Sequence, residues 1–469
     1  MYLVFRRETV KTYDDKFSKS TDKLTKLPMN KRLEIIQNFI SDLNSQTNGI
    51  VIPEPITAGE FGYSIYNAAY TAPELLIGNN RKITFDKKWQ TFENGFHRIP
   101  DNEIVIGFMY FDKKTNECRK VINTIIDYLL HGLIKGQSSK WLKVPLIPMK
   151  YSTKHYVYST NDDNLSLKIR AEEISKSKAI NFVVCIVPMK NDDSEYSPEQ
   201  PYYDIFKKVF ADINIPSQMV SLNKFNSSNI NSALGILGKS GGVPWIFSQP
   251  FNDVDCFVGI DVGMQSKGIH YPACSVCFDG NGNFLGYYKA EKAQSGEKID
   301  TRILEDIFDK ILIEYNAKNG HYPKHIVIHR DGFSNESDEW YEKYFSKKSI
   351  EYDLVEVKKN ISERLIDINN SNGMNPDAGV CIIKDNEAII VTTKRDAKYG
   401  GAPQPLEIVH KHGSLSMDEI VRQIYSLSEL HVGSVQSTRL PMTTYYADRI
   451  CKAGEYIPRG KIYNKLYFL

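Results

Sequence analysis

The feature that most constrains this chain is an alternation of apolar strand candidates with helix candidates. Apolar runs at 102–111 and 179–190 flank a helix-like segment at 118–136, and a further helix and strand follow within 198–222. Strands that alternate with helices over short connections favour a parallel sheet with helices on its faces. We therefore predict that this first block of the chain has an α/β fold.

A second block of strands and helices follows a polar segment at 247–256. A β-hairpin is predicted at 273–290, around a Gly-Asn-Gly turn of the kind that joins two adjacent strands. A helix at 303–318 and a short buried strand at 325–333 come next. Because 469 residues exceed one ordinary core, we predict that the two blocks form separate domains.

Residues 1–80 form a mixed, charged segment before the first block. They contain one helix candidate at 30–46, whose apolar residues recur at helical spacing. They end in a segment at 73–80 that is predicted as a turn or linker. We expect this part of the chain to be an N-terminal extension.

Composition excludes some classes of protein. The 59 basic and 57 acidic residues give a net charge of +2, so any nucleic-acid contact has to come from a local basic groove. Seven scattered cysteines do not match a disulfide framework, and no apolar run reaches the roughly 18 residues of a membrane helix. The N-terminus lacks a signal-peptide pattern, and we expect a cytoplasmic location.

Three aspartates in the second block stand near the ends of separate elements. Asp261 lies inside the apolar run VGIDVG, Asp331 ends IVIHRD, and Asp448 lies in LPMTTYYADR. A buried, unpaired charge is costly, so Asp261 needs a partner, a metal or a chemical role. Carboxylate oxygens favour Mg²⁺ or Mn²⁺, and two such ions can hydrolyse a phosphodiester. The flanking Gly259 and Gly263 are expected to let metal ions and a nucleic-acid backbone approach the strand.

Each aspartate taken alone has an ordinary structural alternative. Asp331 is also suited to capping the loop that follows it, and Asp448 is also suited to a solvent-exposed helix position. The case for a metal site therefore depends on whether the three residues lie together.

A second group of residues, in the first block, suits an anion. Tyr203 and Lys207 are four residues apart and share one helix face. Gln218 follows a proline in a loop, and Lys239 lies in GKSGGVPW. An aromatic face, two ammonium groups and an amide together suit a nucleotide with a 5′-phosphate. Each of these residues alone also fits a solvated helix or loop.

Several of these motifs occur together in one family. VGIDVG, IHRDGF and LPMTTYYADR resemble motifs of the PIWI domain of Argonaute proteins, and the stretches 355–365 and 398–408 match further parts of that domain in order. The resemblance covers approximately residues 80–469. It implies an extension or linker at 1–80, a Rossmann-like MID domain at 81–250 that binds the guide 5′ end, and an RNase H-like PIWI domain at 251–469.

The resemblance implies a catalytic set of four acidic residues. Asp448 takes the last position of the set, after Asp261 and Asp331, and these three aspartates are also the implied metal ligands. The remaining member is a glutamate on a mobile loop, for which QSGEKI offers Glu297. Glu291, in the same segment, remains the alternative.

The resemblance also implies residues that hold the guide. The family's 5′-phosphate pattern is matched in order by Tyr203, Lys207, Gln218 and Lys239. Many eukaryotic members carry a further lysine at the position of Gly235. In prokaryotic relatives a metal ion, held with the help of the C-terminal carboxylate, can replace that charge, and Leu469 is the terminal residue here. Arg364 and Arg439 stand inside matching motifs and are predicted to contact the nucleic-acid backbone.

Two functions follow from the resemblance, and the residues leave both open. One is a guide-directed endonuclease that binds a 5′-phosphorylated guide and cleaves the complementary target with two Mg²⁺ or Mn²⁺ ions. The other is a module that holds guide and target, DNA or RNA, while a partner protein carries the effector activity. The segment at 1–80 is too short for the N-terminal and PAZ domains of long Argonautes, so a short form, or a split form with a separate partner, is expected. A generic RNase H-like nuclease would leave the 5′-phosphate motifs unexplained.

Overall fold

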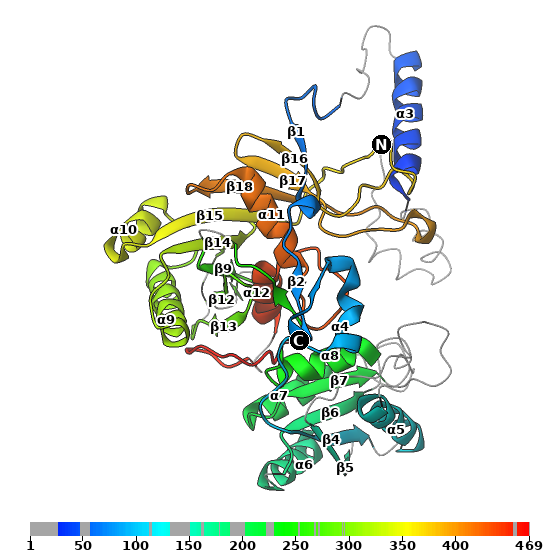
Figure 1. Cartoon of the computed structure of the whole chain (residues 1–469), viewed down its shortest axis with the longest axis vertical. Coiled ribbons are helices and arrows are strands. Elements are labelled where there is room, and N and C mark those ends of the chain that lie inside the picture. Colours follow the sequence, from blue (N-terminus) through cyan, green and yellow to red (C-terminus); the bar gives the residue numbers. More distant parts are fainter. Residues whose placement is uncertain are drawn as a thin grey trace.

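The computed structural model describes most of the chain. The described residues are 27–46, 57–111, 115–131, 151–160, 164–177, 179–187, 202–221, 229–251, 254–266, 269–270, 273–292, 294, 296–453 and 457–468. Within these ranges, no helix combines the length and the apolar composition that crossing a membrane requires. Figure 1 shows an elongated molecule with a four-stranded sheet at one end and a nine-stranded sheet further up.

The first block forms a parallel sheet with helices on both faces. The strands, in spatial order, are β5 (Tyr151–Thr160), β4 (Ile104–Phe111), β6 (Phe182–Val187) and β7 (Ser217–Ser221). The helices are α5 (Thr115–His131), α6 (Asn164–Ser177), α7 (Tyr202–Asp212) and α8 (Asn229–Lys239). Val184 of β6 packs in the core with α5 and α8, whereas its neighbour Val183 packs with α6 and α7. The predicted Rossmann-like α/β arrangement is confirmed.

The second block forms a mixed sheet of nine strands. In spatial order these are β1 (Ser64–Asn67), β16 (Val380–Lys384), β17 (Glu387–Ile390), β18 (Leu406–His412), β15 (Glu351–Lys358), β14 (His325–Asp331), β9 (Cys256–Asp261), β12 (Cys274–Asp279) and β13 (Phe284–Lys289). β14 is parallel to β9 and β15, and the other pairs are antiparallel. The predicted hairpin at 273–290 is confirmed as β12 and β13.

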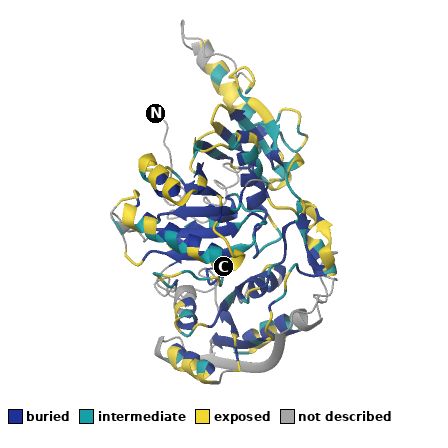
Figure 2. Ribbon diagram, turned by 60° about the vertical axis from the view of Figure 1, so that its left-hand side comes forward, coloured by how far each residue is buried: buried dark blue, intermediate teal, exposed yellow. Residues whose placement is uncertain are grey.

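Helices cover both faces of this larger sheet. One face packs against α9 (Thr301–Asn319) and α10 (Asp338–Lys348), and the other packs against α11 (Met417–Ser428) and α12 (Met442–Lys452). Figure 2 shows buried strands inside the molecule, with exposed residues concentrated on outer helices and loops. This hairpin, helix and strand on one sheet, covered by helices, agrees with the predicted RNase H-like fold.

The described part of the N-terminal segment, residues 27–46 and 57–80, contacts the second block. Its predicted helix is present as α3 (Met29–Gln46), and β1 extends the edge of the nine-stranded sheet. The prediction of a turn or linker at 73–80 is wrong for Leu75–Leu76, which form β2 between β3 (Lys82–Ile83) and β8 (Ile246–Phe247). Leu75 is buried, and its partner strand β8 is far away in sequence, so local patterns do not encode this pairing.

Short elements complete the description. They are η1 (Ala68–Tyr70), η2 (Gly78–Asn80), η3 (Phe85–Gln90), α4 (Thr91–Asn94), η7 (Ala397–Tyr399), β10 (Met264–Ser266) and β11 (Ile269–His270). β10 and β11 pair with each other in a small antiparallel sheet next to the end of β9. The domain boundaries at 80 and 250 stay predictions.

Helix α12 lies directly against β9, an interior strand of the nine-stranded sheet. A Cβ atom added at Gly259 would lie 2.2 Å from the backbone carbonyl atoms of Thr443 on α12. The expected role of Gly259, an opening for metal ions and nucleic acid, is therefore wrong, because the helix occupies that space. The missing side chain instead lets α12 approach the strand that ends in Asp261.

Candidate active site and phosphate pocket

The three predicted aspartates lie together at one edge of the nine-stranded sheet. Asp261 ends β9 and Asp331 ends the adjacent parallel strand β14, so both side chains stand at the same edge. Asp448 comes from α12, which packs against both strands. One carboxylate oxygen of each residue lies within 4.8 Å of those of the other two. We name Asp261, Asp331 and Asp448 the acid cluster.

The acid cluster is crowded and largely buried. Burial and the negative charge of Asp331 raise the pKa of Asp261 to about 7. Burial also raises the pKa of Asp331, against the opposing charge of Lys359. Burial acts in the same direction on Asp448, but hydrogen bonds from Lys359 and Lys452 bring its pKa below the ordinary value. Clustered carboxylate oxygens of this kind fit a hard divalent cation such as Mg²⁺ or Mn²⁺.

Two lysines that the predicted site did not include neutralise part of this charge. Lys359 Nζ donates to Asp331 Oδ2 and to Asp448 Oδ1, at 2.6 Å in each case. Lys452 Nζ donates to Asp448 Oδ2 at 2.8 Å. Lys359 directly follows β15, the parallel neighbour of β14, so knowledge of the strand order would have placed it beside Asp331.

Neither candidate glutamate lies in the acid cluster. Glu297 is exposed, and the metal-ligand group found among the described residues contains the three aspartates alone. Glu291 is also exposed and lies beside Gly460 in the C-terminal segment. The arrangement therefore does not decide between the two glutamates.

A buried ion pair anchors the loop that carries Glu297. Arg330 Nε lies 3.4 Å from Glu336 Oε2, and both side chains are buried. Arg330 also donates to the carbonyl of Glu297 at 3.1 Å and to that of Asp331 at 2.8 Å. Glu336 Oε1 accepts from the backbone of Ile299 at 3.1 Å. The pair thus ties the glutamate loop to the strand end of Asp331. The sequence suggested Arg330 only as one of several basic residues suited to a nucleic-acid groove, and it gave no sign of Glu336 or of the anchoring of this loop.

The predicted guide pocket contains two buried lysines. Lys207 Nζ donates to the carbonyls of Ser217 at 3.2 Å and Tyr467 at 2.9 Å. Lys239 Nζ donates to Gln218 Oε1 at 2.6 Å. Lys207 and Lys239 are 3% and 1% exposed. We name Lys207, Gln218 and Lys239 the lysine pocket.

Burial controls the charge of this pocket. It lowers the pKa of Lys207 to about 8. Burial, and next the positive charge of Lys207, lower the pKa of Lys239 well below its ordinary value. The contacts described above are to neutral carbonyl and amide oxygens, which accept hydrogen bonds from the ammonium groups but carry no full negative charge. An anion such as phosphate would stabilise both charged lysines.

Three other positions, Gly235, Tyr203 and Leu469, were predicted to belong to this pocket or to affect it. A Cβ atom added at Gly235 would lie 2.5 Å from Gln218 Oε1, so a lysine there would displace the amide that Lys239 contacts. The departure at Gly235 therefore has a steric reason. The side chain of Tyr203, and the whole of Leu469, lie outside the described residues. The three residues before Leu469 are buried.

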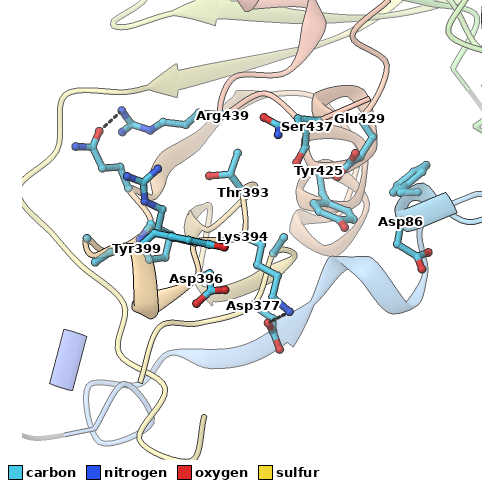
Figure 3. A pocket seen from close by; sticks show the side chains of 18 of the residues that line it. Asp86, Asp377, Thr393, Lys394, Asp396, Tyr399, Tyr425, Glu429, Ser437 and Arg439 are labelled. Carbon is cyan, nitrogen blue, oxygen red and sulfur yellow. Dashed lines mark hydrogen bonds and ion pairs between the residues drawn. The ribbon is translucent and has the colours of Figure 1, made fainter. Parts of the chain in front are cut away.

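A cavity of about 1190 Å³ is lined by Arg32 of α3, by Phe85 and Asp86 of η3, and by residues of the second block (Figure 3). Its charged lining residues are Arg32, Asp86, Asp377, Lys394, Arg395, Asp396, Glu429 and Arg439. Arg439 Nη1 donates to Gln404 Oε1 at 3.0 Å, and Nη2 donates to the carbonyls of Pro405 and Lys359. Burial and the charge of Arg364 lower the pKa of Arg439, so the two predicted arginines lie near each other.

Comparisons with known proteins bear on this geometry. The model of the Piwi domain matches residues 182–457. Protein argonaute of Aquifex aeolicus is 26% identical over 326 residues, which cover 66% of this chain and 44% of that protein. Protein argonaute of Thermus thermophilus is 29% identical over 225 residues, which cover 47% of this chain and 32% of that protein. The chain thus spans less than half the length of these curated relatives.

A solved structure is similar over almost the whole chain. It is Clostridium butyricum Argonaute bound to a guide DNA and a 19-mer target DNA, with a TM-score of 0.87 and 37% sequence identity. The match covers 99% of this chain and 63% of that one. A second solved structure, of Aa-Ago with externally bound siRNA, has a TM-score of 0.60 at 20% identity and supports the fold alone.

Proposed function

We propose that this chain, which belongs to the Argonaute family and carries its Piwi domain, is a guide-directed endonuclease. It binds a 5′-phosphorylated guide strand and hydrolyses the complementary strand with divalent cations, Mg²⁺ or Mn²⁺. The acid cluster is the observation that carries this proposal. Its three carboxylates meet at one sheet edge, within 4.8 Å of one another, and offer the hard oxygen ligands that these cations prefer.

The residues of the acid cluster have distinct parts in the proposal. Asp261 and Asp331 stand on two adjacent strand ends and give the site a rigid base, and Asp448 completes it from α12. When bound, the cations supply activation of a water molecule and stabilisation of the leaving oxygen. Asp261 must lose its proton to act as a metal ligand. Because its pKa is raised to about 7, we expect the fraction of Asp261 that can bind a metal to change with pH near neutrality.

Glu297 is the proposed fourth acidic residue. Its loop is held through its backbone by Arg330, while its own side chain is exposed. We therefore expect the loop to move before this side chain can reach the acid cluster. Arg330 and Glu336 would act as the anchor from which the loop moves, since both contact its backbone.

The lysine pocket is the proposed site for the guide 5′-phosphate. Two buried ammonium groups that stand close together and donate to carbonyl and amide oxygens favour a doubly charged anion. The side chain of Tyr203 is proposed to stack on the first base, and the terminal carboxylate of Leu469 to help hold a cation. The relative from Clostridium butyricum was solved with DNA as guide and as target, so DNA is the first substrate to test here.

The large cavity is the proposed path of a nucleic-acid strand. Arg439 lines it and also holds the backbone of Lys359, whose side chain touches the acid cluster. A strand that follows this cavity would therefore pass close to the acid cluster. Arg364 and Arg439 are proposed to contact its phosphates. We also propose the boundaries 1–80, 81–250 and 251–469 for the extension, the MID domain and the PIWI domain.

One experiment tests the nuclease function. The purified chain is incubated with a 5′-phosphorylated DNA guide, a labelled complementary strand and Mn²⁺, beside the variant Asp331→Asn. We expect a single product from the unchanged chain and none from the variant. This chain spans less than half the length of the curated relatives. A second reaction therefore also contains a separate protein corresponding to the part of those relatives that this chain does not match.

Absence of product in both reactions, with intact guide binding, would overturn the nuclease proposal. It would instead support the alternative, a module that holds guide and target for a separate effector protein. The acid cluster favours the nuclease, because a binding module has no need for three carboxylates close together at a strand edge. RNA guides and RNA targets, tested in the same assay, decide the nucleic-acid class.

A further inference from the structure

The ammonium group of Lys359 lies between two carboxylates of the acid cluster. It donates to Asp331 and Asp448 over equal distances of 2.6 Å. The Lys359 side chain is 29% exposed, and those of Asp331 and Asp448 are 4% and 13% exposed. Solvent screens such a contact much less than an ordinary surface ion pair.

The backbone of Lys359 is fixed by the strand that precedes it and by a hydrogen bond to its carbonyl. It follows β15, whose residue Val357 is in register with Asp331 on the parallel strand β14. The carbonyl of Lys359 accepts a hydrogen bond from Arg439 Nη2, and the same guanidinium also donates to the carbonyl of Pro405 and to Gln404 Oε1. The side chain therefore starts from a fixed point at the same sheet edge as the acid cluster.

The neighbouring lysine has different partners. Lys358 is the last residue of β15 and donates to Glu407 at 2.8 Å, with Glu356 at 3.5 Å. Lys452 contacts Asp448 from α12, but its side chain is 65% exposed. The three lysines thus differ stepwise in their contact with the acid cluster. Lys359 is half-buried and bridges two of its carboxylates, Lys452 is exposed and contacts one, and Lys358 pairs with other residues.

We propose that Lys359 is the resident counter-cation of the acid cluster and competes with divalent cations for Asp331 and Asp448. The ammonium holds the two carboxylates together when no metal is bound. It has to leave when a divalent cation takes the same oxygens, because the cation and the ammonium compete for the same lone pairs and repel each other at this short range. Lys359 is thus a positioning residue that sets the metal concentration at which the site fills. This inference rests on the proposed metal site.

The test measures metal binding by the full chain without nucleic acid. Free Mn²⁺ is followed by electron paramagnetic resonance while the unchanged chain and single variants are titrated. Lys359→Met, which keeps the length of the side chain, is expected to bind Mn²⁺ about tenfold more tightly, because a like charge has been removed from a half-buried site. Lys452→Met is expected to bind Mn²⁺ about two- to threefold more tightly than the unchanged chain, a smaller gain because water screens an exposed charge. Lys358→Met is the matched control and should bind as the unchanged chain does.

A second measurement separates competition from a general effect on folding. In the presence of EDTA, Lys359→Met should melt at a lower temperature than the unchanged chain, because its carboxylates have lost their bridge. Added Mn²⁺ should raise the melting temperature of Lys359→Met by more than that of the unchanged chain. Lys358→Met also removes an ion-pair bridge, between Glu356 and Glu407, so its melting temperature in EDTA is expected to fall as well. The comparison is therefore made on the gain with Mn²⁺, which should be no larger for Lys358→Met than for the unchanged chain.

The variant Asp331→Asn separates the two ways in which the proposal can fail. If Asp331→Asn loses Mn²⁺ binding and Lys359→Met binds no more tightly than the unchanged chain, competition by Lys359 is overturned while the metal site stands. If Asp331→Asn binds Mn²⁺ as the unchanged chain does, the metal site of the proposed nuclease is wrong, and the inference about Lys359 fails with it. Tighter binding by Lys359→Met that disappears in the double variant with Asp331→Asn supports the inference.

Discussion

The acid cluster and the lysine pocket both bury like charges, and they stabilise them in opposite ways. In the acid cluster, Lys359 and Lys452 supply positive charge directly to the carboxylates. In the lysine pocket, Lys207 and Lys239 contact carbonyl and amide oxygens, and burial lowers the pKa of both. The acid cluster therefore has its counter-charges in direct contact, whereas burial in the lysine pocket disfavours the charged form of both lysines.

The largest expected effect comes from removing one member of the acid cluster. Asp331→Asn should reduce cleavage of the target strand by about a thousandfold or more, since it removes a charge-bearing ligand from the reacting centre. Guide affinity, measured by filter binding, should stay within about threefold of the unchanged chain, because the lysine pocket lies on the other sheet. An equal loss of guide affinity would show that the two sites are not separate.

The double variant Lys207→Ala and Lys239→Ala tests the lysine pocket as the site for the guide 5′-phosphate. Each charged hydrogen bond to phosphate contributes about 1.5–3 kcal/mol, so affinity for a 5′-phosphorylated guide should fall about a hundredfold or more. Affinity for a 5′-hydroxyl guide should change little. Lys208→Ala is the matched control, because Lys208 lies on the same helix but is exposed and pairs with Asp212. Equal weakening of both guides would remove the pocket assignment.

Gly259→Ala tests whether the close packing of α12 on β9 positions the acid cluster. The new Cβ atom would lie 2.2 Å from backbone atoms of Thr443, so the helix must shift. We expect the free energy of unfolding to fall by about 1–3 kcal/mol, with a loss of cleavage because Asp448 moves away from Asp261. Chemical denaturation measures the first effect. Gly59→Ala, where a Cβ atom meets nothing closer than 4.0 Å, is the control and should be neutral.

The smallest expected effect is a pH dependence of guide binding. Burial lowers the pKa of Lys207 from 10.5 to about 8, so in the folded chain Lys207 is charged below about pH 8 and loses its charge as pH rises above it. The chain without guide should therefore gain stability between about pH 8 and 10.5, where only the unfolded state still binds the proton. Affinity for a 5′-phosphate should fall by up to about tenfold per pH unit above 8, because binding needs the charged lysine.

The 5′-phosphate itself gives this measurement an internal control. Its second ionisation lies near pH 6, so its charge is constant over the range in which Lys207 titrates. A fluorescence titration of 5′-phosphorylated and 5′-hydroxyl guides between pH 7 and 9.5 separates the two contributions. A pH dependence of the same size for both guides would contradict the assignment to Lys207.

Much of the larger architecture was predictable from local patterns. Apolar runs and helical spacing predicted the α/β block, and the Gly-Asn-Gly turn predicted the hairpin β12–β13, because both depend on residues that are close in sequence. The spacing of Asp261, Asp331 and Asp448 suggested a metal site only once their motifs were considered together. The pairing of β2 with β8 was not predictable, since Leu75 and its partners are separated by most of the first block.

What the sequence determined by itself is the set of chemical groups: three aspartates at the ends of elements, and two lysines with an amide in the other block. Their residue types and local elements are properties of short stretches, which obey local physical rules. Only the tertiary structure decided what stands beside these groups. Lys359 reaches the acid cluster because β15 is the neighbour of β14. Gly259 accommodates α12, and Gly235 accommodates Gln218. Each of these contacts depends on the order in which strands and helices pack, and that order is a property of the whole core.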